Sequence, residues 1–238
     1  MDSRFVLRLS NVVSGYSDLP VLWGIDLDVT ENETLVVLGA NGAGKSTMIK
    51  TIIGELPLKE GSIELLGEDV GKYKIHQRIG MGLAYMSELG VFPTLSIHEN
   101  LMLGAYGLKR SDVRHRLEEV YSLFSELKGR KGDLASSLSG GQRKLLGIGK
   151  ALMSNPKVLV MDEPSSGLSP LYVKEVIASL STLTGTGRAM VIAEQNVSFL
   201  QLSNRVCVIE GGRVSFEGST TEFENQEVLH KAFFGIEG

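Results

Sequence analysis

One stretch of the chain has the residue types and the spacing that bind the phosphates of a nucleotide. The segment GANGAGKST fits the pattern G-x-x-x-x-G-K-[ST], with an apolar strand expected before it and a helix after it. Glycines permit a tight loop whose backbone N–H groups surround phosphate oxygens, and the start of the following helix adds its positive end. We therefore predict a nucleotide-binding loop made of Gly39, Ala40, Asn41, Gly42, Ala43, Gly44, Lys45, Ser46 and Thr47.

Two side chains in this loop and two acids far along the chain are suited to handling phosphates and a metal ion. Lys45 can reach the β- and γ-phosphates, and the Ser46 hydroxyl can bind Mg²⁺. An apolar run at residues 158–161 ends in Asp162 and Glu163, like a second core strand with an acidic end. We predict that Asp162 holds Mg²⁺ through water and that Glu163 polarises the attacking water. The expected cofactors are ATP and Mg²⁺.

A serine, two glycines and a glutamine make a second helix start that can bind an anion. The predicted helix at residues 143–153 is opened by Ser139, Gly140, Gly141 and Gln142. One chain does not need two such sites for one triphosphate. The economical explanation is that this second site faces a nucleotide held by another subunit.

Alternating strand and helix patterns position these residues. Residues 34–38 are continuously apolar, as in a strand buried on both faces, and a helix is predicted over residues 45–53. Strands return at residues 158–161 and 189–193, with a helix near 172–183 between them. This alternation predicts an α/β fold with parallel strands. Further strands are predicted at residues 5–9, 25–29, 62–66, 205–209 and 213–217, the last two as a hairpin around two glycines.

The middle of the chain reads as helical. Ser96 and Glu99 have the spacing of a capping box, and no strand pattern occurs between residues 96 and 156. Apolar side chains at helical spacing form one stripe made of Val113, Leu117, Val120, Tyr121 and Phe124. We expect a single domain over residues 1–238, in which a helical lobe at 88–156 is inserted between core segments 1–87 and 157–238.

Composition limits the class of protein. The chain has 238 residues, 42% of them hydrophobic, enough for one large domain with a buried core. Its net charge of −4 argues against a nucleic-acid partner, which favours a basic face. No apolar run of the roughly 18 residues needed to span a bilayer occurs, and the N-terminus lacks a secretory apolar core. Cys207 is the single cysteine, so we expect no intrachain disulfide and a reducing compartment.

The order of the three motifs resembles that of ATP-binding cassette (ABC) proteins. The phosphate loop comes first, LSGGQ at residues 138–142 follows, and Asp162-Glu163 comes last. This resemblance covers essentially the whole chain and implies a P-loop NTPase core with a mixed sheet, an N-terminal antiparallel β subdomain and the inserted helical lobe. It implies that Tyr16 stacks on adenine. It also implies a head-to-tail dimer that closes with ATP between loop 39–47 of one subunit and residues 139–142 of the other.

Three positions depart from the pattern of that family. Gln195 stands where the family has a switch histidine that contacts the γ-phosphate, and Ser169 stands where aspartate is usual. The family has a glutamine that contacts the metal at a position that Ser87 matches in the sequence. The neighbouring Glu88 has a side chain long enough to make that contact, so both assignments remain open. A glutamine cannot shuttle a proton near pH 7, although its amide can donate to a phosphate oxygen. The role of base therefore falls on Glu163.

Several short segments resemble the ATP-binding subunits of branched-chain amino acid importers. They are EQN at 194–196, VFP at 91–93, HENL at 98–101, GKALM at 149–153 and AFFGI at 232–236. Urea and other amide importers use similar subunits, so the branch is better supported than the solute. The resemblance implies a second, identical or homologous ATP-binding subunit and transmembrane permease subunits. The chain would lie peripherally at the cytoplasmic face of the inner membrane, with no direct contact to the solute.

The same resemblance implies a groove between lobe and core that receives a short coupling helix of the membrane subunit. Leu89, Val91, Phe92 and Leu95 are candidates to line it, or else to form the local core of the lobe. One alternative is a soluble ABC ATPase with no membrane partner, acting in DNA repair or on ribosomes. Neither the long coiled coil of the repair proteins nor the paired cassettes of the ribosomal ones occur here. The other alternative, a P-loop kinase, leaves residues 138–142 without a role.

Overall fold

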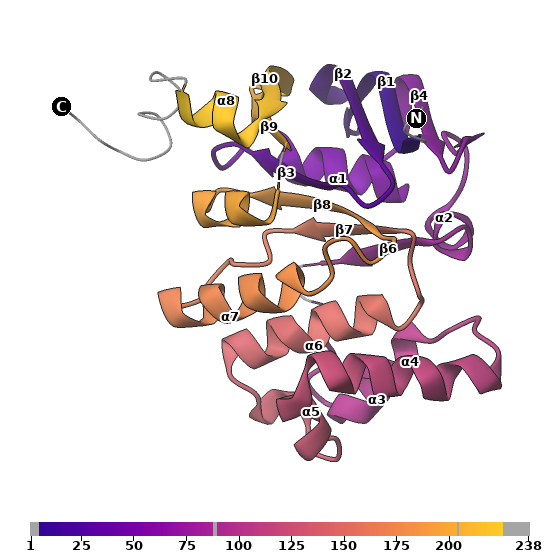
Figure 1. Ribbon diagram of the computed structural model, residues 1–238. Helices are drawn as coiled ribbons and strands as arrows, with labels where there is room; N and C mark the ends of the chain where they lie inside the picture. The colour runs from indigo at the N-terminus through magenta and orange to yellow at the C-terminus, as the bar shows by residue number, and fades with distance from the viewer. Residues whose placement is uncertain (1–4, 88–89, 204, 226–238) are drawn as a thin grey trace.

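Two β-sheets and a set of helices make up the computed structural model, which describes residues 5–87, 90–203 and 205–225 (Figure 1). Among the described residues, an antiparallel sheet has the strand order β2-β1-β4-β5. Its strands are β1 (Phe5–Tyr16), β2 (Leu19–Thr30), β4 (Leu58–Leu65) and β5 (Glu68–Asp69). This sheet is the predicted antiparallel subdomain, and β1 and β2 extend well beyond the predicted runs at residues 5–9 and 25–29.

The central sheet has the strand order β10-β9-β3-β8-β7-β6. It is mixed as predicted, because β10 pairs antiparallel with β9 while the other neighbours are parallel. Its strands are β3 (Thr34–Leu38), β6 (Leu83–Met86), β7 (Val158–Asp162), β8 (Ala189–Glu194), β9 (Arg205–Glu210) and β10 (Arg213–Ser219). The carboxyl ends of β3, β8, β7 and β6 therefore meet at one edge, where ligands of open α/β sheets bind.

The helices cover both faces of the central sheet. They are α1 (Lys45–Ile53), α2 (Ile75–Gly80), α3 (Ile97–Gly104), α4 (Arg110–Leu123), α5 (Ser125–Gly129), α6 (Gly140–Leu152), α7 (Pro170–Ser181) and α8 (Thr220–Asn225), with 3-10 turns η1 (Ala135–Ser137) and η2 (Val197–Leu202). In Figure 1, α1 lies between the two sheets, whereas α3 to α6 lie beyond the opposite face of the central sheet. None of the described helices is long and apolar enough to cross a membrane.

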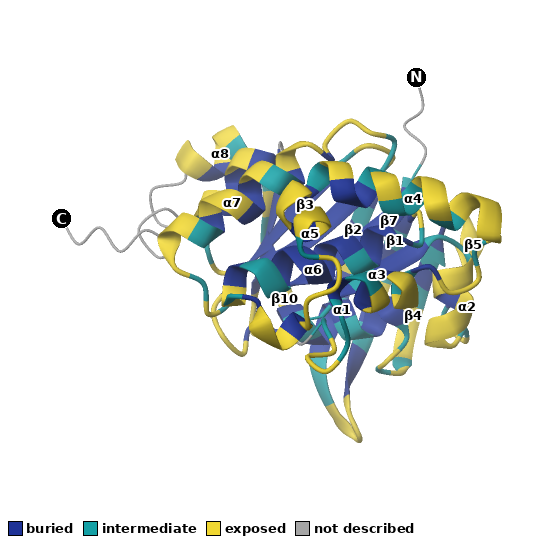
Figure 2. Cartoon of the chain, turned by 90° about the horizontal axis from the view of Figure 1, so that it is seen from below, coloured by how far each residue is buried: buried dark blue, intermediate teal, exposed yellow. Residues whose placement is uncertain are grey.

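Strand β3 shows why the core divides in two. All five of its residues are buried. Leu35 and Val37 pack into the core that contains α1 and the antiparallel sheet, while Val36 and Leu38 pack into the core that contains α3, α6 and α7. Successive side chains of a strand point to opposite faces, so a strand buried on both faces needs a continuous apolar run. Figure 2 shows this buried interior enclosed by the exposed outer faces of the helices.

The lobe helices begin where the sequence supplies caps. The Ser96 hydroxyl accepts from Glu99 N, and the Glu99 carboxylate accepts from Ser96 N, so the predicted capping box opens α3. In the predicted apolar stripe, Val120, Tyr121 and Phe124 are buried, whereas the other two members are half-buried against the same core.

Several short elements escaped sequence reasoning, among them β6 and α2, and the start of one helix was predicted too late. Strand β6 and helix α2 are short and flank a glycine, so neither shows a period in the sequence. Helix α6 begins at Gly140, three residues before the predicted 143, because Ser139 and Gln142 form a second capping box.

Candidate nucleotide-binding site

The predicted phosphate loop connects β3 to α1 at the edge where the parallel strands end. Gly44 is the residue before α1 and has a φ of 115°, a left-handed conformation that glycine adopts at little cost. The turn between β9 and β10 packs against this loop, since Gly212 N donates to Ala43 O at 2.8 Å. A Cβ on Gly212 would stand 1.7 Å from Val21 O, so only glycine permits this approach.

Lys45 lies at the centre of the loop and is 3% exposed. Its Nζ donates to Gly39 O at 2.8 Å and to Ala40 O at 3.2 Å. The same ammonium lies 3.4 Å from Glu163 Oε1, the proposed base. The sequence-predicted cation therefore lies between the phosphate loop and the acidic strand end.

Two of the three predicted metal ligands, Ser46 and Asp162, are in contact. Ser46 Oγ donates to Asp162 Oδ1 at 3.0 Å. Burial raises the pKa of Asp162, and the hydrogen bond from Ser46 opposes that rise. Among the described residues no three His, Cys, Asp or Glu side chains gather around one point. One hydroxyl and one carboxylate fit Mg²⁺ bound also to water and phosphate oxygens, which is how nucleotide sites hold this ion.

Glu163 directly follows β7 and adopts a left-handed backbone with a φ of 46°. Non-glycine residues occupy this region only where neighbouring contacts hold them there, and such residues cluster at functional sites. Glu163 N donates to Ala193 O at 2.9 Å, and Ser166 N donates to Glu163 O at 3.1 Å. These contacts place the side chain next to the phosphate loop, with 24% of it exposed.

Gln195 lies between the phosphate loop and Glu163. Its Nε2 donates to Asn41 Oδ1 and, at 3.1 Å, to Glu163 Oε1. The strand order explains this position, because β8 lies between β3 and β7 with Leu38 opposite Glu194. The residue after β8 must therefore face both the loop after β3 and the acid after β7.

A cavity of about 350 Å³ joins the remaining predicted nucleotide contacts. Tyr16 lies at its rim with 46% of its surface exposed, and Lys50 Nζ lies 5.8 Å from the centre of the tyrosine ring. The ring therefore presents a face to solvent, as stacking on a base requires. The cavity is lined by Tyr16, Val21, Asn41, Gly42, Gly44, Lys45, Ser46, Thr47 and Glu163.

The second predicted anion site stands apart from this cavity. Helix α6 packs into the core on one face of the central sheet and α1 into the core on the other. At the start of α6, Gly140 is exposed. Gln142 closes the capping box and accepts from Arg130 Nη1 at 3.2 Å. Loop 39–47 and residues 139–142 thus lie in two separate places of one chain.

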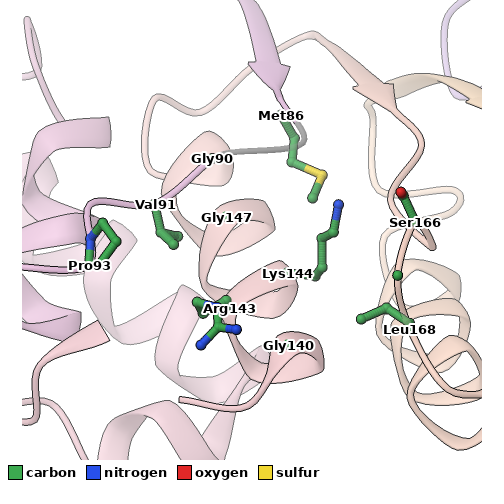
Figure 3. A pocket seen from close by; sticks show the side chains of 11 residues that line it. Met86, Gly90, Val91, Pro93, Gly140, Arg143, Lys144, Gly147, Ser166 and Leu168 are labelled. Carbon is green, nitrogen blue, oxygen red and sulfur yellow. The ribbon is translucent and has the colours of Figure 1, made fainter. Parts of the chain in front are cut away.

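A hollow of 520 Å³ separates the start of α6 from the loop that follows Glu163 (Figure 3). Figure 3 shows Lys144 extending from α6 toward the segment that carries Ser166. Lys144 is 8% exposed, and its Nζ donates to Glu163 O at 3.3 Å. The helical lobe therefore contacts the turn of Glu163 through one buried cation.

The structure gives fewer contacts for the remaining predicted positions. Ser87 directly follows β6, whose Met86 pairs with Met161, so it lies near the strand end of Asp162. Its backbone oxygen accepts from Gly90 N at 3.1 Å. Glu88, Leu89 and the AFFGI segment at 232–236 lie outside the described residues. Ser169 precedes α7 as its N-cap, and its side chain makes no capping hydrogen bond.

Two residues of the site were missed. Glu194 was quoted only as part of the EQN segment, although an acid at the end of a buried strand is a signal in itself. In the sequence, Lys144 is one position of a predicted helix, and only the packing of α6 reveals its contact with Glu163.

A P-loop nucleotide hydrolase is the class that this fold and site define. A solved ATP-binding cassette of an ABC transporter in its ADP conformation has the same fold, with a TM-score of 0.83 and 25% identity. That similarity covers 98% of this chain and 99% of the other.

The family model described as ABC transporter matches residues 22–166. The probable branched-chain amino acid transport ATP-binding protein LivF of Archaeoglobus fulgidus is 32% identical, over 97% of this chain and 99% of its own. The high-affinity branched-chain amino acid transport ATP-binding protein BraG of Pseudomonas aeruginosa is also 32% identical, over 97% and 100%. The lipopolysaccharide export system ATP-binding protein LptB of Haemophilus influenzae is 29% identical, over 97% of each chain. The chain belongs to the ABC transporter family and is an ATP-hydrolysing, ATP-binding subunit of a transporter.

Proposed function

We propose that this chain powers an importer of branched-chain amino acids, or of a related small amino acid or amide, by closing with a second ATP-binding subunit around ATP. The observation that carries the proposal is the pair of separate half-sites. Loop 39–47 offers a cation and a metal pair on one side of the central sheet, and α6 offers a capped helix start on the other. Each half-site becomes complete when two subunits, identical or homologous, pair head to tail.

In the closed pair, the residues of the nucleotide site divide the chemistry among them. Lys45 neutralises charge on the β- and γ-phosphates, and the amides of residues 139–142 of the second subunit add positive dipoles there. Ser46 and Asp162 would hold Mg²⁺, which would supply positive charge against the phosphates. Glu163 accepts the proton of the attacking water. Gln195 donates to the γ-phosphate, since its amide cannot take up a proton near pH 7.

We propose that a second surface of the chain, a groove between the core and the lobe, binds a short apolar helix of the permease. A groove of about 600 Å³ opens between α2, β6 and the lobe helices α3 and α6. Its lining includes exposed apolar side chains at Ile79, Phe92, Leu103 and Tyr106, and exposed patches of this kind mark interaction sites. Lys150 Nζ lies 5.1 Å from the centre of the Phe92 ring, so one wall carries a cation as well.

Of the candidates for this groove, Phe92 lines it. Val91 faces the hollow of Figure 3 and packs against the lobe core, and Leu95 is half-buried. Phe92 is therefore the anchor that we propose for the permease helix, and Val91 belongs to the packing of the lobe. The chain would sit at the cytoplasmic face of the membrane through this contact alone.

The kind of solute is inferred from the resemblance of the EQN, VFP and HENL segments to importer subunits and from relatives that are similar over nearly the whole chain. Two of these relatives serve branched-chain amino acid transport and one serves lipopolysaccharide export. The small-solute branch is the better supported, because the more similar relatives belong to it. The chain itself makes no contact with the solute in this proposal.

Two measurements test the proposal. A tagged chain drawn from detergent-solubilised membranes is expected to carry permease subunits with it, and Phe92→Ala is expected to lose them. Recovery with ribosomes or DNA and without membrane proteins contradicts the proposal and favours a soluble ABC ATPase. Cells that lack the chain are expected to lose uptake of radiolabelled leucine, and Glu163→Gln should not restore it. Normal leucine uptake with loss of urea or amide uptake keeps the branch and changes the solute, whereas normal uptake of all three contradicts an importer.

A further inference from the structure

Glu194 is a buried acid whose role in the proposed chemistry is unassigned so far. It ends β8, where the residues before it are apolar, and it is 2% exposed. Its Oε1 accepts from Ser165 N at 2.7 Å, and its Oε2 accepts from Gln195 N at 3.1 Å and Asn196 N at 3.3 Å. Its partners in these contacts are backbone N–H groups. Burying a carboxylate costs free energy unless such hydrogen bonds stabilise it, so the buried position of Glu194 suggests a functional role.

The two oxygens of Glu194 bind two different loops. One holds the turn of residues 163–166, in which Glu163 has a left-handed backbone that depends on its surroundings. The other holds the segment that begins with Gln195, whose amide donates to Glu163 Oε1 at 3.1 Å. The carboxylate of Glu194 thus fixes both ends of the hydrogen bond between Gln195 and Glu163.

We propose that Glu194 is a positioning residue for ATP hydrolysis, which locks the turn of Glu163 to the segment of Gln195 and so keeps the base aimed at the attacking water. The proposal rests on the proposed role of Glu163. Glu194 itself touches neither phosphate nor water in this role. Burial raises the pKa of this carboxyl, and hydrogen bonding by the Ser165 side chain and by the three backbone N–H groups opposes that rise by favouring the ionised form.

The first test is Glu194→Gln, which keeps the size of the side chain and replaces one acceptor oxygen by an NH₂ group that cannot accept. One of the two loops then faces a donor instead of an acceptor. We expect kcat of the purified full chain to fall about ten- to hundred-fold, as a displacement near 1 Å does, while the dissociation constant for ATP stays within about two-fold. Glu194→Asp keeps the charge and shortens the reach of the side chain, so it should also lower kcat. This variant provides the test if Glu194→Gln does not fold.

Glu33→Gln is the matched control. Glu33 is a largely buried carboxylate that accepts from Thr30 N at 2.7 Å, at the opposite end of the central strands from the phosphate loop. A purely structural role of Glu194 predicts that both glutamine variants lose melting temperature and activity in the same proportion. The positioning role predicts a loss of kcat in Glu194→Gln alone. Wild-type kcat in both Glu194 variants, or equal losses in Glu194→Gln and the control, overturns the proposal.

A double-mutant cycle with Glu163→Gln separates this inference from the role of Glu163. A residue that acts through Glu163 has nothing left to position once that base is gone, so the double variant should be no slower than Glu163→Gln. Multiplied losses in the double variant overturn the positioning role and leave Glu163 as the base. Near-normal turnover in Glu163→Gln alone removes the base assignment and this inference with it.

Discussion

The two adjacent glycines of the second half-site offer a test that separates fold from function. A Cβ built on Gly141 would stand 2.2 Å, 2.5 Å and 2.9 Å from three atoms of the Tyr172 side chain, where α6 and α7 touch. The closest of these are ring atoms, but the third is the Tyr172 Cβ, which a rotamer change cannot remove. On Gly140 the same Cβ would meet nothing nearer than Leu168 Cδ2 at 3.7 Å, an ordinary contact.

The magnitudes follow from this difference. Overpacking of a close helix contact costs about 1–3 kcal/mol, and a domain of this size loses about 2–4 °C of melting temperature per kcal/mol. An alanine at either glycine gains a similar helix propensity, so Gly141→Ala should melt about 2–12 °C lower than Gly140→Ala. Gly140→Ala gains helix propensity of up to about 1 kcal/mol at the first position of α6, so its melting temperature should hold or rise by up to about 4 °C.

In Gly140→Ala, unlike the melting temperature, the ATPase activity should fall. Gly140 is exposed at the helix start that faces the nucleotide of the second subunit in our proposal. A methyl group there would hold the amides away from the phosphates, so we expect the ATPase rate to fall at least about ten-fold, or 1.4 kcal/mol, with unchanged ATP affinity of the single chain. The measurements are thermal unfolding by circular dichroism and phosphate release at saturating ATP. A Gly141→Ala protein that melts at the same temperature as Gly140→Ala refutes the close packing, and full activity of Gly140→Ala refutes the shared site.

Four further outcomes are expected. Glu163→Gln should bind ATP normally, hydrolyse it about 10²–10⁴-fold more slowly and elute as a dimer with ATP in size-exclusion chromatography; near-normal turnover would exclude Glu163 as the base. Lys45→Ala should raise the ATP dissociation constant about 10- to 150-fold, because it removes a charged hydrogen bond worth about 1.5–3 kcal/mol, and unchanged affinity in a binding titration contradicts the loop assignment. The wild-type pH–rate profile should lack a step near the ordinary histidine pKa of about 6.5, and Gln195→His should add one with a modest change in rate; a large gain means that the native site is impaired. Burial raises the pKa of Cys207 to about 12, so Ellman's reagent should label it at pH 8 only after unfolding, since the thiolate is the reactive form; rapid labelling of the folded chain contradicts that burial.

The parts of the fold that were predictable depend on local patterns with one physical meaning. The continuous apolar run of β3 and the glycine-rich loop after it located α1 to the residue, because a strand buried on both faces and a loop of this type leave few alternatives. The capping box at Ser96 and Glu99 likewise located the start of α3. Each of these features is contained within a few neighbouring residues.

The parts that were not predictable depend on contacts between distant segments. Strand β6 is short and owes its state to pairing with β7, as Tyr85 opposite Val160 illustrates. Arg78 of α2 is 1% exposed and donates from Nη1 to Thr51 O at 2.8 Å and to Ile52 O, at the end of α1. An arginine reads as a surface residue in a sequence, and only the packing of α2 against α1 reveals that its charge is buried and bonded. Glu194 has a local signal as an acid at the end of a buried strand, but the two loops that it binds become visible only in the fold.

The strand order places Gln195, the residue after β8, where its chemical type affects the mechanism. Because β8 lies between β3 and β7, the residue after it contacts both the phosphate loop and Glu163, whatever its chemical type. A histidine in this place has a ring that can exchange a proton near pH 7, whereas a glutamine can only donate or accept hydrogen bonds. The amide of Gln195 donates to the carboxylate of Glu163 and so helps to hold the proposed base in place. The substitution therefore removes a competing proton acceptor and supports the remaining one, so Gln195 is compatible with hydrolysis that depends on Glu163 alone.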